Sequence, residues 1–204
     1  MNSTRVPLFP LNLLPLPGET VALHVFEERY QALFNRLEAM DLDEFGIPFV
    51  DGDCLTRLGG LMRLIFASAP DENGFRDAAV QCIGLFKLAS PVHIPETDEN
   101  PPYPSGEIAR WSDWKNYDLT ENAAFDFSKT EQLQKTSENE KSVCMPGNGL
   151  IQSLIRHQIT PKKRYDILNA PDLKRRNEQI NNAARFSFLI AEQEAQRNKG
   201  YFPN

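Results

Sequence analysis

Four prolines, at positions 7, 10, 15 and 17, limit what the apolar segment 6–17 can form. Proline interrupts a continuous helix and donates no hydrogen bond to a strand ladder, so this segment is neither a helix nor a central strand. We expect residues 7–11 to lie extended or at a sheet edge. Pro17 and Gly18 fit the centre of a type II turn, because glycine accepts the positive φ that this turn requires.

The rest of the front half consists of short apolar runs separated by turns, a pattern typical of β-structure. We expect strands at 21–26, 45–50, 58–66, 80–88 and 103–114, with residues 71–74 forming a hairpin connection. The alternation within the first of these strands predicts two faces. One face carries Val21, Leu23 and Val25, and the other carries Ala22, His24 and Phe26.

Helical spacing appears once in the front half and again in the tail. Residues 27–40 form one apolar stripe of Tyr30, Leu33, Phe34, Leu37 and Met40. In the tail we expect one helix at 150–159 that stops at Pro161, and a longer one from Pro171 to about Asn198. Residues 120–145 are polar and aperiodic, which predicts a long connection with one short helix.

These patterns predict an α+β chain with a β domain at 1–118 and a linker and helical subdomain at 119–204. Hydrophobic residues make up 41% of the chain and charged residues 25%, a globular composition. The net charge is −6, but residues 1–110 carry −8 and residues 149–204 carry +5. The acidic front half argues against a general nucleic-acid binder.

Sequence motifs for common catalytic chemistry are missing. The chain has no Walker A sequence, no G-x-G-x-x-G after a strand, no G-x-S-x-G and no H-E-x-x-H. The histidines and cysteines, which are His24, His93, His157, Cys54, Cys82 and Cys144, lack metal-ligand spacing. We therefore expect no catalytic residue, no metal and no cofactor.

The three cysteines are an odd number without a close pair, which is typical of reduced thiols in a cytosolic protein. The segment 6–17 loosely resembles the apolar region of a signal peptide, but its prolines and the lack of a cleavage site argue that it belongs to the fold. We expect a cytoplasmic protein that does not enter a membrane.

Several polar residues have both a structural and a functional interpretation. We expect His24 to be half-buried and bonded to backbone, Cys82 to lie in the core and His157 to be solvated. The cluster of Glu27, Glu28 and Arg29 reads as a helix start, with Arg29 paired to a nearby carboxylate; a ligand-facing site is the alternative. The basic runs 162–164 and 174–176 read as solvated helix faces, although they could contact phosphate or an acidic partner.

The first thirty residues resemble the opening of the Lon N-terminal domain family. The resemblance rests on Pro-Leu-Phe-Pro-Leu at 7–11, Pro-Gly-Glu at 17–19, Leu-His-Val-Phe-Glu at 23–27 and Arg29-Tyr30. That family includes the substrate-recognition domain of the ATP-dependent Lon protease and stand-alone bacterial proteins. The resemblance implies a β-rich, PUA-like pseudo-barrel with one early helix, followed by a helical subdomain. It implies neither ATPase nor protease activity.

The resemblance further implies a non-enzymatic module that binds unfolded or hydrophobic protein segments, with an ATP-dependent protease in trans as a further candidate partner. The residues that we expect at the binding surface are Phe9, Leu14, Leu16, Phe26, Glu27, Arg29 and Tyr30. The alternative is that the five apolar residues are all core, an interpretation we favour for Phe26 and Tyr30. A groove between the two parts of the chain and a sheet edge both stay open as the place of binding.

Two other functions remain as alternatives. A PUA-like fold with a basic tail would suit an RNA-associated module, whose binding would weaken steeply with salt. A small hydrolase could use His24 or Cys82, provided that either side chain lies in an open cleft beside a carboxylate.

Overall fold

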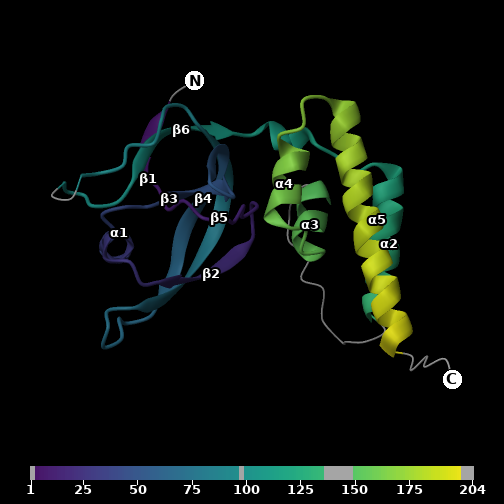
Figure 1. Ribbon diagram of the computed structural model, residues 1–204, viewed down its shortest axis with the longest axis horizontal. Coiled ribbons are helices and arrows are strands. Elements are labelled where there is room, and N and C mark those ends of the chain that lie inside the picture. The colour runs from purple at the N-terminus through teal and green to yellow at the C-terminus, as the bar shows by residue number, and fades with distance from the viewer. Residues whose placement is uncertain (1–2, 97–98, 136–148, 199–204) are drawn as a thin grey trace. The chain divides into compact units, whose positions relative to one another are not determined.

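The computed structural model describes residues 3–96, 99–135 and 149–198, and its contacts divide the chain into two compact units. We call Met1–Asp113 the β unit and Trp114–Asn204 the helical unit. Every strand that the structure describes lies in the β unit, together with one helix, and the remaining α-helices follow in the helical unit (Figure 1). The predicted α+β class is therefore confirmed. The two units divide between residues 113 and 114, whereas the boundary predicted from the sequence was at 118.

A curled antiparallel sheet forms the β unit. Its strands are β1 (Thr4–Pro7), β2 (Thr20–Val25), β3 (Phe45–Asp51), β4 (Cys54–Ala67), β5 (Arg76–Leu88) and β6 (Ser105–Trp111). Neighbouring strands follow the order β1-β6-β5-β4-β3. Because β4 pairs with β5 along most of its length, β2 and β6 share the other edge of β5, one after the other.

The proline-rich segment curls this sheet toward a barrel. Beyond β1 the chain runs parallel to β3, with bridges from Leu8 to Gly46 and from Leu11 to Phe49. The Phe9 N–H donates to the Gly46 carbonyl oxygen at 2.8 Å. A Cβ atom on Gly46 would lie 2.7 Å from Leu8 Cδ2, so glycine is what lets the two segments approach this closely. The segment is extended, as its prolines predict.

The turn before β2 also matches the sequence. Gly18 has a φ of 93°, and the Glu19 N–H donates to the Leu16 carbonyl oxygen at 2.9 Å. This is the geometry of a type II turn with Pro17 and Gly18 at its centre. It delivers the chain into β2 one residue before the predicted start.

Helix α1 (Glu28–Glu38) covers one face of the sheet, which we call the inner face. The predicted stripe is buried at Tyr30, Leu33, Phe34 and Leu37, but its fifth member, Met40, lies past the end of α1 and is exposed, so that part of the prediction is wrong. These residues share a core cluster with Leu23 and Val25 of β2 and with Ala78 and Val80 of β5. A polar contact reinforces this packing, because the buried Arg76 donates hydrogen bonds to Asn35 and Glu38 of α1.

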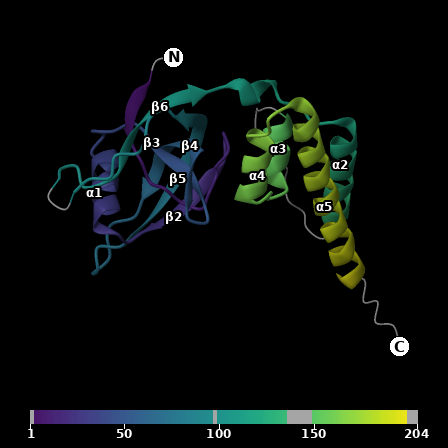
Figure 2. The same cartoon turned by 45° about the horizontal axis from the view of Figure 1, so that its top comes forward.

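The helical unit contains α2 (Glu121–Lys135), α3 (Gly149–Arg156), α4 (Pro161–Leu168) and α5 (Leu173–Asn198), after a short 3₁₀ segment, η1 (Asp113–Asn116). Helices α2 and α5 run side by side in both views (Figures 1 and 2). Their contact buries apolar residues, among them Ala123 and Phe127 of α2 and Ile180 and Ala184 of α5.

One sequence prediction for this unit is wrong and one helix was missed. Residues 121–135 form the full helix α2, where the sequence predicted a connection with one short helix. Helix α3 ends at Arg156, before Pro161 as predicted, but Pro161 then begins the unpredicted helix α4, because proline suits the first turn, where its missing N–H has no intrahelical partner to lose. The rest of the predicted connection, and Cys144 within it, lie outside the described residues.

Candidate functional site

Four of the residues predicted for the binding surface fill the core of the β unit. Phe9, Leu14, Leu16 and Tyr30 are all buried. The Phe9 ring stacks on Tyr30 with 3.9 Å between the ring centroids, and burial raises the pKa of the Tyr30 hydroxyl. The expectation of Tyr30 as a core residue is confirmed, while a contact of these four residues with a partner stays a prediction.

The other three predicted residues lie at the surface, where β2 leads into α1. Phe26 is 55% exposed, so the expectation that it belongs to the core is wrong. Arg29 pairs with the Glu27 carboxylate at 2.6 Å and lies over the Tyr30 ring. This contact confirms the predicted pairing of Arg29 with a nearby carboxylate at the helix start.

Strand register places further aromatic residues on the same face as Phe26. Phe66 of β4 pairs with Ala79 of β5, which in turn pairs with Ala22 of β2, so these three side chains point to one side. Because side chains alternate along a strand, His24 and Phe26 point to the same side as Ala22, and Asp77 and Phe75 point to the same side as Ala79. We call this surface the aromatic face and define it by His24, Phe26, Phe66 and Phe75, with Asp77 among them.

The aromatic face is open to solvent. Phe66 is 60% exposed, and Phe75 is half-buried. The centroid of the His24 ring lies 6.2 Å from that of Phe26 and 6.0 Å from that of Phe75, and the two phenylalanine rings are 6.3 Å apart. The rings of His24, Phe26 and Phe75 therefore contact one another and form an ordered surface. Helix α1 does not cover this surface, because it packs on the inner face.

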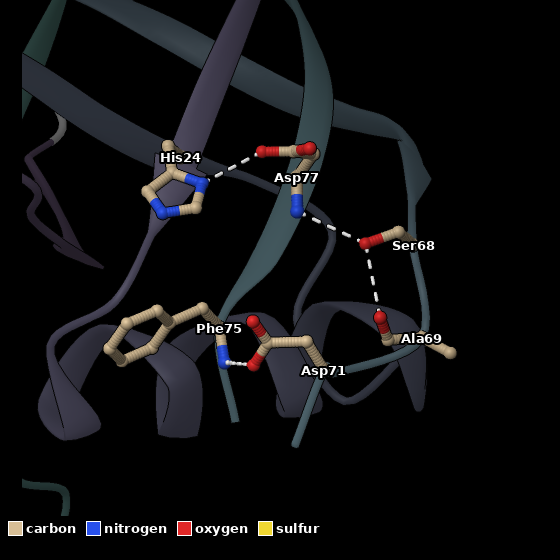
Figure 3. Close-up of polar contacts among 6 residues, drawn as sticks. All are labelled: His24, Ser68, Ala69, Asp71, Phe75 and Asp77. Atoms are coloured by element: carbon tan, nitrogen blue, oxygen red, sulfur yellow. Dashed lines mark hydrogen bonds and ion pairs between the residues drawn. The ribbon is translucent and has the colours of Figure 1, made fainter. Parts of the chain in front are cut away.

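A polar pair lies within this surface (Figure 3). The Nδ1 atom of His24 is 2.8 Å from Oδ1 of Asp77, and the side chains are 61% and 80% exposed. The expectation that His24 is half-buried and bonded to backbone is therefore wrong. Below the pair, Asp71 fixes Phe75, because its Oδ1 atom accepts the Phe75 N–H at 2.8 Å (Figure 3).

The Ser68 hydroxyl, which lies beside this pair, is not arranged for nucleophilic catalysis. Ser68 accepts the Asp77 N–H and donates its own hydrogen to the Ala69 carbonyl oxygen at 3.1 Å (Figure 3). The hydroxyl hydrogen therefore points to Ala69 and is not passed to His24, as a general base would require.

The second candidate for hydrolytic chemistry is enclosed. Cys82 is 1% exposed, and its Sγ atom lies 3.4 Å from the Pro15 carbonyl oxygen. This confirms its predicted place in the core. A substrate cannot reach a thiol in such a position without opening the β unit.

The helical unit holds a cavity of about 510 Å³ between the end of α2, the α3–α4 connection and the middle of α5. His157 borders it, but its side chain is only 1% exposed and stacks on Phe127. Neither ring nitrogen has a hydrogen-bond partner among the described residues, and desolvation lowers the pKa of the ring. The prediction of a solvated His157 is therefore wrong.

The basic run at the start of α4 divides between surface and interior. Lys162 pairs with Asp166 at 3.0 Å, whereas Arg164 is buried. A continuous solvated basic face, as predicted for 162–164, is therefore absent from this helix.

The described ranges of the chain lack features for holding a metal ion or spanning a membrane. No group of three His, Cys, Asp or Glu residues there is placed to hold a metal ion. None of the helices in the same ranges combines the length and apolarity that a bilayer span needs.

Phe66 and Phe75 are the residues of the aromatic face that sequence reasoning missed. Phe75 could have been found from the alternation that continues backward from the predicted strand 80–88. Phe66 could not, because a register shift between Leu64 and Phe66 changes which face the end of β4 presents.

No protein-family model and no curated protein matches the sequence. Among the solved structures that resemble this one are two Lon N-terminal domains. The Lon N-terminal domain protein from Xanthomonas campestris matches with a TM-score of 0.62 and 19% identity, over 87% of this chain and 96% of its own. The N-terminal domain of Lon protease from the Mycobacterium avium complex matches with a TM-score of 0.63 and 14% identity, over 89% and 98%.

Proposed function

We propose that this chain, which has the fold of Lon N-terminal domains, is a non-enzymatic module that binds unfolded protein segments through its aromatic face. The observation that carries the proposal is the exposure of Phe26 and Phe66 on one regular, ordered side of the sheet. Both matched structures are N-terminal domains, so no ATPase or protease chemistry comes with the likeness.

Exposed phenylalanines gathered on one face are unusual for a folded domain. Single apolar residues at a surface need no explanation, but a contiguous apolar patch marks an interaction site. Phenylalanine also loses little conformational freedom on binding, since it has only two side-chain torsions. Burying such a ring beneath a partner contributes on the order of 1–2 kcal/mol. Two or three such contacts together contribute about 2–6 kcal/mol, and the upper end of this range corresponds to a Kd of about 100 μM.

The partner class follows from the shape of this surface. Ala22 and Ala79 lie between the larger rings, so apolar side chains from a partner would meet small residues flanked by aromatic ones. An unfolded segment can place its apolar side chains on such a surface, whereas a folded protein keeps most of them inside. Within the described residues β2 is paired only with β5, so a segment on the aromatic face lies close to a free strand edge as well.

A binding titration tests the proposal. The probe is a fluorescently labelled protein held unfolded by reduction and alkylation of its disulfides, and the readout is fluorescence anisotropy. We expect the parent chain to bind with a Kd below about 100 μM. The double variant Phe26→Ala/Phe66→Ala should bind at least tenfold more weakly, because truncating two exposed rings removes about 1–2 kcal/mol or more.

The matched control is Phe125→Ala. Phe125 is 59% exposed, as Phe26 and Phe66 are, but it lies on α2 in the helical unit. This variant should bind like the parent. Equal loss in both variants would show that binding depends on general apolar exposure, and no binding by the parent up to 100 μM would refute the proposal.

The same titration separates the two alternative functions. An RNA-associated module would bind a labelled RNA with a steep dependence on salt concentration. A hydrolase would cleave the probe and lose activity in His24→Ala. The negative charge of the β unit argues against RNA binding. The hydrogen bond from Ser68 to the Ala69 carbonyl oxygen argues against its use as a nucleophile.

A further inference from the structure

The aromatic face contains a carboxylate that can accept a further contact. Asp77 is 80% exposed, and its Oδ1 atom takes the contact with His24. Its Oδ2 atom has no partner in the part of the chain that the structure describes. Because this carboxylate stands in solvent, it offers a cation a modest, salt-dependent attraction that adds to the contact with the neighbouring rings.

The rings around Asp77 favour the same kind of ligand. Phe75 stands nearly perpendicular to the His24 and Phe26 rings, with interplanar angles of 81° and 75°. Perpendicular packing leaves ring faces available at the surface. The face of an aromatic ring carries partial negative charge and attracts a lysine ammonium or an arginine guanidinium within about 6 Å of its centroid.

The surroundings of the face are acidic. Exposed carboxylates lie close to its aromatic residues in the chain, at Asp71 and Glu72 ahead of Phe75 and at Glu28 just after Phe26. The nearby cation Arg29 is neutralised by Glu27 at 2.6 Å. Arg63 lies on the same side of the sheet but pairs with Gln81, four residues along β5 from Asp77 and so about 13 Å away.

The whole β unit has the same sign of charge. Residues 1–113 contain 17 acidic and 8 basic residues. A field of this sign speeds the approach of cationic segments and opposes acidic ones.

From these contacts we infer that the aromatic face selects unfolded segments in which a lysine or arginine stands next to apolar residues. The cation pairs with Asp77 and lies over the Phe26 or Phe75 ring, while the neighbouring apolar side chain covers Phe66. This inference rests on the proposed function and specifies the chemistry of its partner.

Three short labelled peptides test the inference. They share the same apolar residues and differ only at the flanking positions, which are lysine in the first, glutamine in the second and glutamate in the third. We expect the lysine peptide to bind about tenfold more tightly than the glutamate peptide, with the glutamine peptide between them. Added salt should reduce this difference.

The site itself is tested by Asp77→Asn, which keeps a hydrogen-bond acceptor for His24 but removes the charge. This variant should weaken binding of the lysine peptide about fourfold and leave the glutamine peptide unchanged. The control is Asp53→Asn, which makes the same change at an exposed position just before the other end of β4.

The outcomes distinguish this inference from the proposed function. If no peptide binds, the proposed function fails. If all three bind equally, the aromatic face binds apolar segments but the selection for cations is refuted. If Asp53→Asn weakens the lysine peptide as much as Asp77→Asn does, the preference comes from overall charge and the assignment to Asp77 is overturned.

Discussion

The two faces of the β2–β5 pair differ in what covers them. On the inner face, Leu23 and Val25 of β2 pack beneath α1 and are almost fully buried. On the other face, His24 of β2 and Phe26 just after the strand alternate with them and stand in solvent. Both faces carry apolar residues, so hydrophobicity alone does not decide which one becomes core.

In this fold, the residues that stabilise the folded state and the residues that are free to contact a partner lie on opposite faces of the same strands. The inner face gains its free energy from burial during folding, and its residues have no apolar surface left for a partner. The aromatic face keeps its apolar surface after folding, so that burial of these rings can drive binding. Substitutions on the two faces should therefore change different measurements.

The largest effect on stability is expected from Phe34→Ala on α1. Phe34 is fully buried, and its ring contacts Phe9 and Phe45 with centroid distances of 6.4 and 5.6 Å. Truncation leaves a cavity beneath the helix and should lower the free energy of unfolding by about 3–5 kcal/mol. Urea unfolding followed by circular dichroism measures this change. A loss below about 1 kcal/mol would show that α1 does not hold the inner face closed.

A smaller loss is expected from Arg76→Met, which removes the polar anchor of the inner face. Arg76 is 5% exposed and donates to Asn35 Oδ1 at 2.6 Å and to Glu38. Methionine fills part of the space but makes neither hydrogen bond, so the free energy of unfolding should fall by about 1–3 kcal/mol. Glu38→Gln keeps an acceptor and should cost less. Unchanged stability in Arg76→Met would show that apolar packing alone positions α1.

The pH dependence of stability gives a third prediction, which concerns the buried His157. His157 is buried in the helical unit, and desolvation lowers its pKa below the ordinary value of 6.5. The unfolded chain therefore binds this proton more readily than the folded chain, so stability is lost as the pH falls below about 6.5. Glu131 opposes and Arg156 reinforces this shift.

His157→Phe isolates this contribution, because phenylalanine keeps the stacking on Phe127 but cannot be protonated. We expect the parent to lose helical stability between pH 7 and pH 5 relative to this variant, in urea titrations monitored at the helical circular dichroism band. Parallel pH profiles for the two proteins would contradict it.

Local patterns were sufficient to predict most of the β unit. Alternation in 21–26 gave both faces of β2, and the helical spacing of Tyr30, Leu33, Phe34 and Leu37 gave the buried stripe of α1. These predictions succeed because each depends only on neighbouring residues and on the repeat of the element. The Pro17-Gly18 turn succeeds for the same reason.

The exposure of Phe26 could not be predicted in this way. Alternation shows that Phe26 shares a face with His24, but which face is covered depends on where α1 packs after the turn. The burial of His157 has a similar cause, since it depends on Phe127, which lies on a different helix thirty residues earlier. Contacts between distant segments leave no periodic trace in the sequence.

Signals for the missed helices were present but weak. Thr120 precedes α2 and its Oγ1 atom accepts the Ala123 N–H at 3.1 Å, which is a helix N-cap. Thr160 followed by Pro161 is a comparable start for α4. Part of each helix faces solvent, so neither segment shows a strong apolar stripe. Without such a stripe, the capping residues alone were not enough to predict the helices.

The smallest effect on stability is expected from Phe26→Ala on the aromatic face. Phe26 lies just after β2 and is more than half exposed, so its truncation creates no cavity and removes only edge contacts with His24 and Phe75. The free energy of unfolding should change by no more than about 0.5 kcal/mol, as for most surface substitutions. Binding of the unfolded probe should nevertheless weaken severalfold, since the lost ring contacts the partner and not the core. A loss of about 2 kcal/mol or more in urea unfolding would mean that the rings support the fold. In that case the aromatic face would be a structural surface, and the distinction between a face that stabilises and a face that binds would not hold.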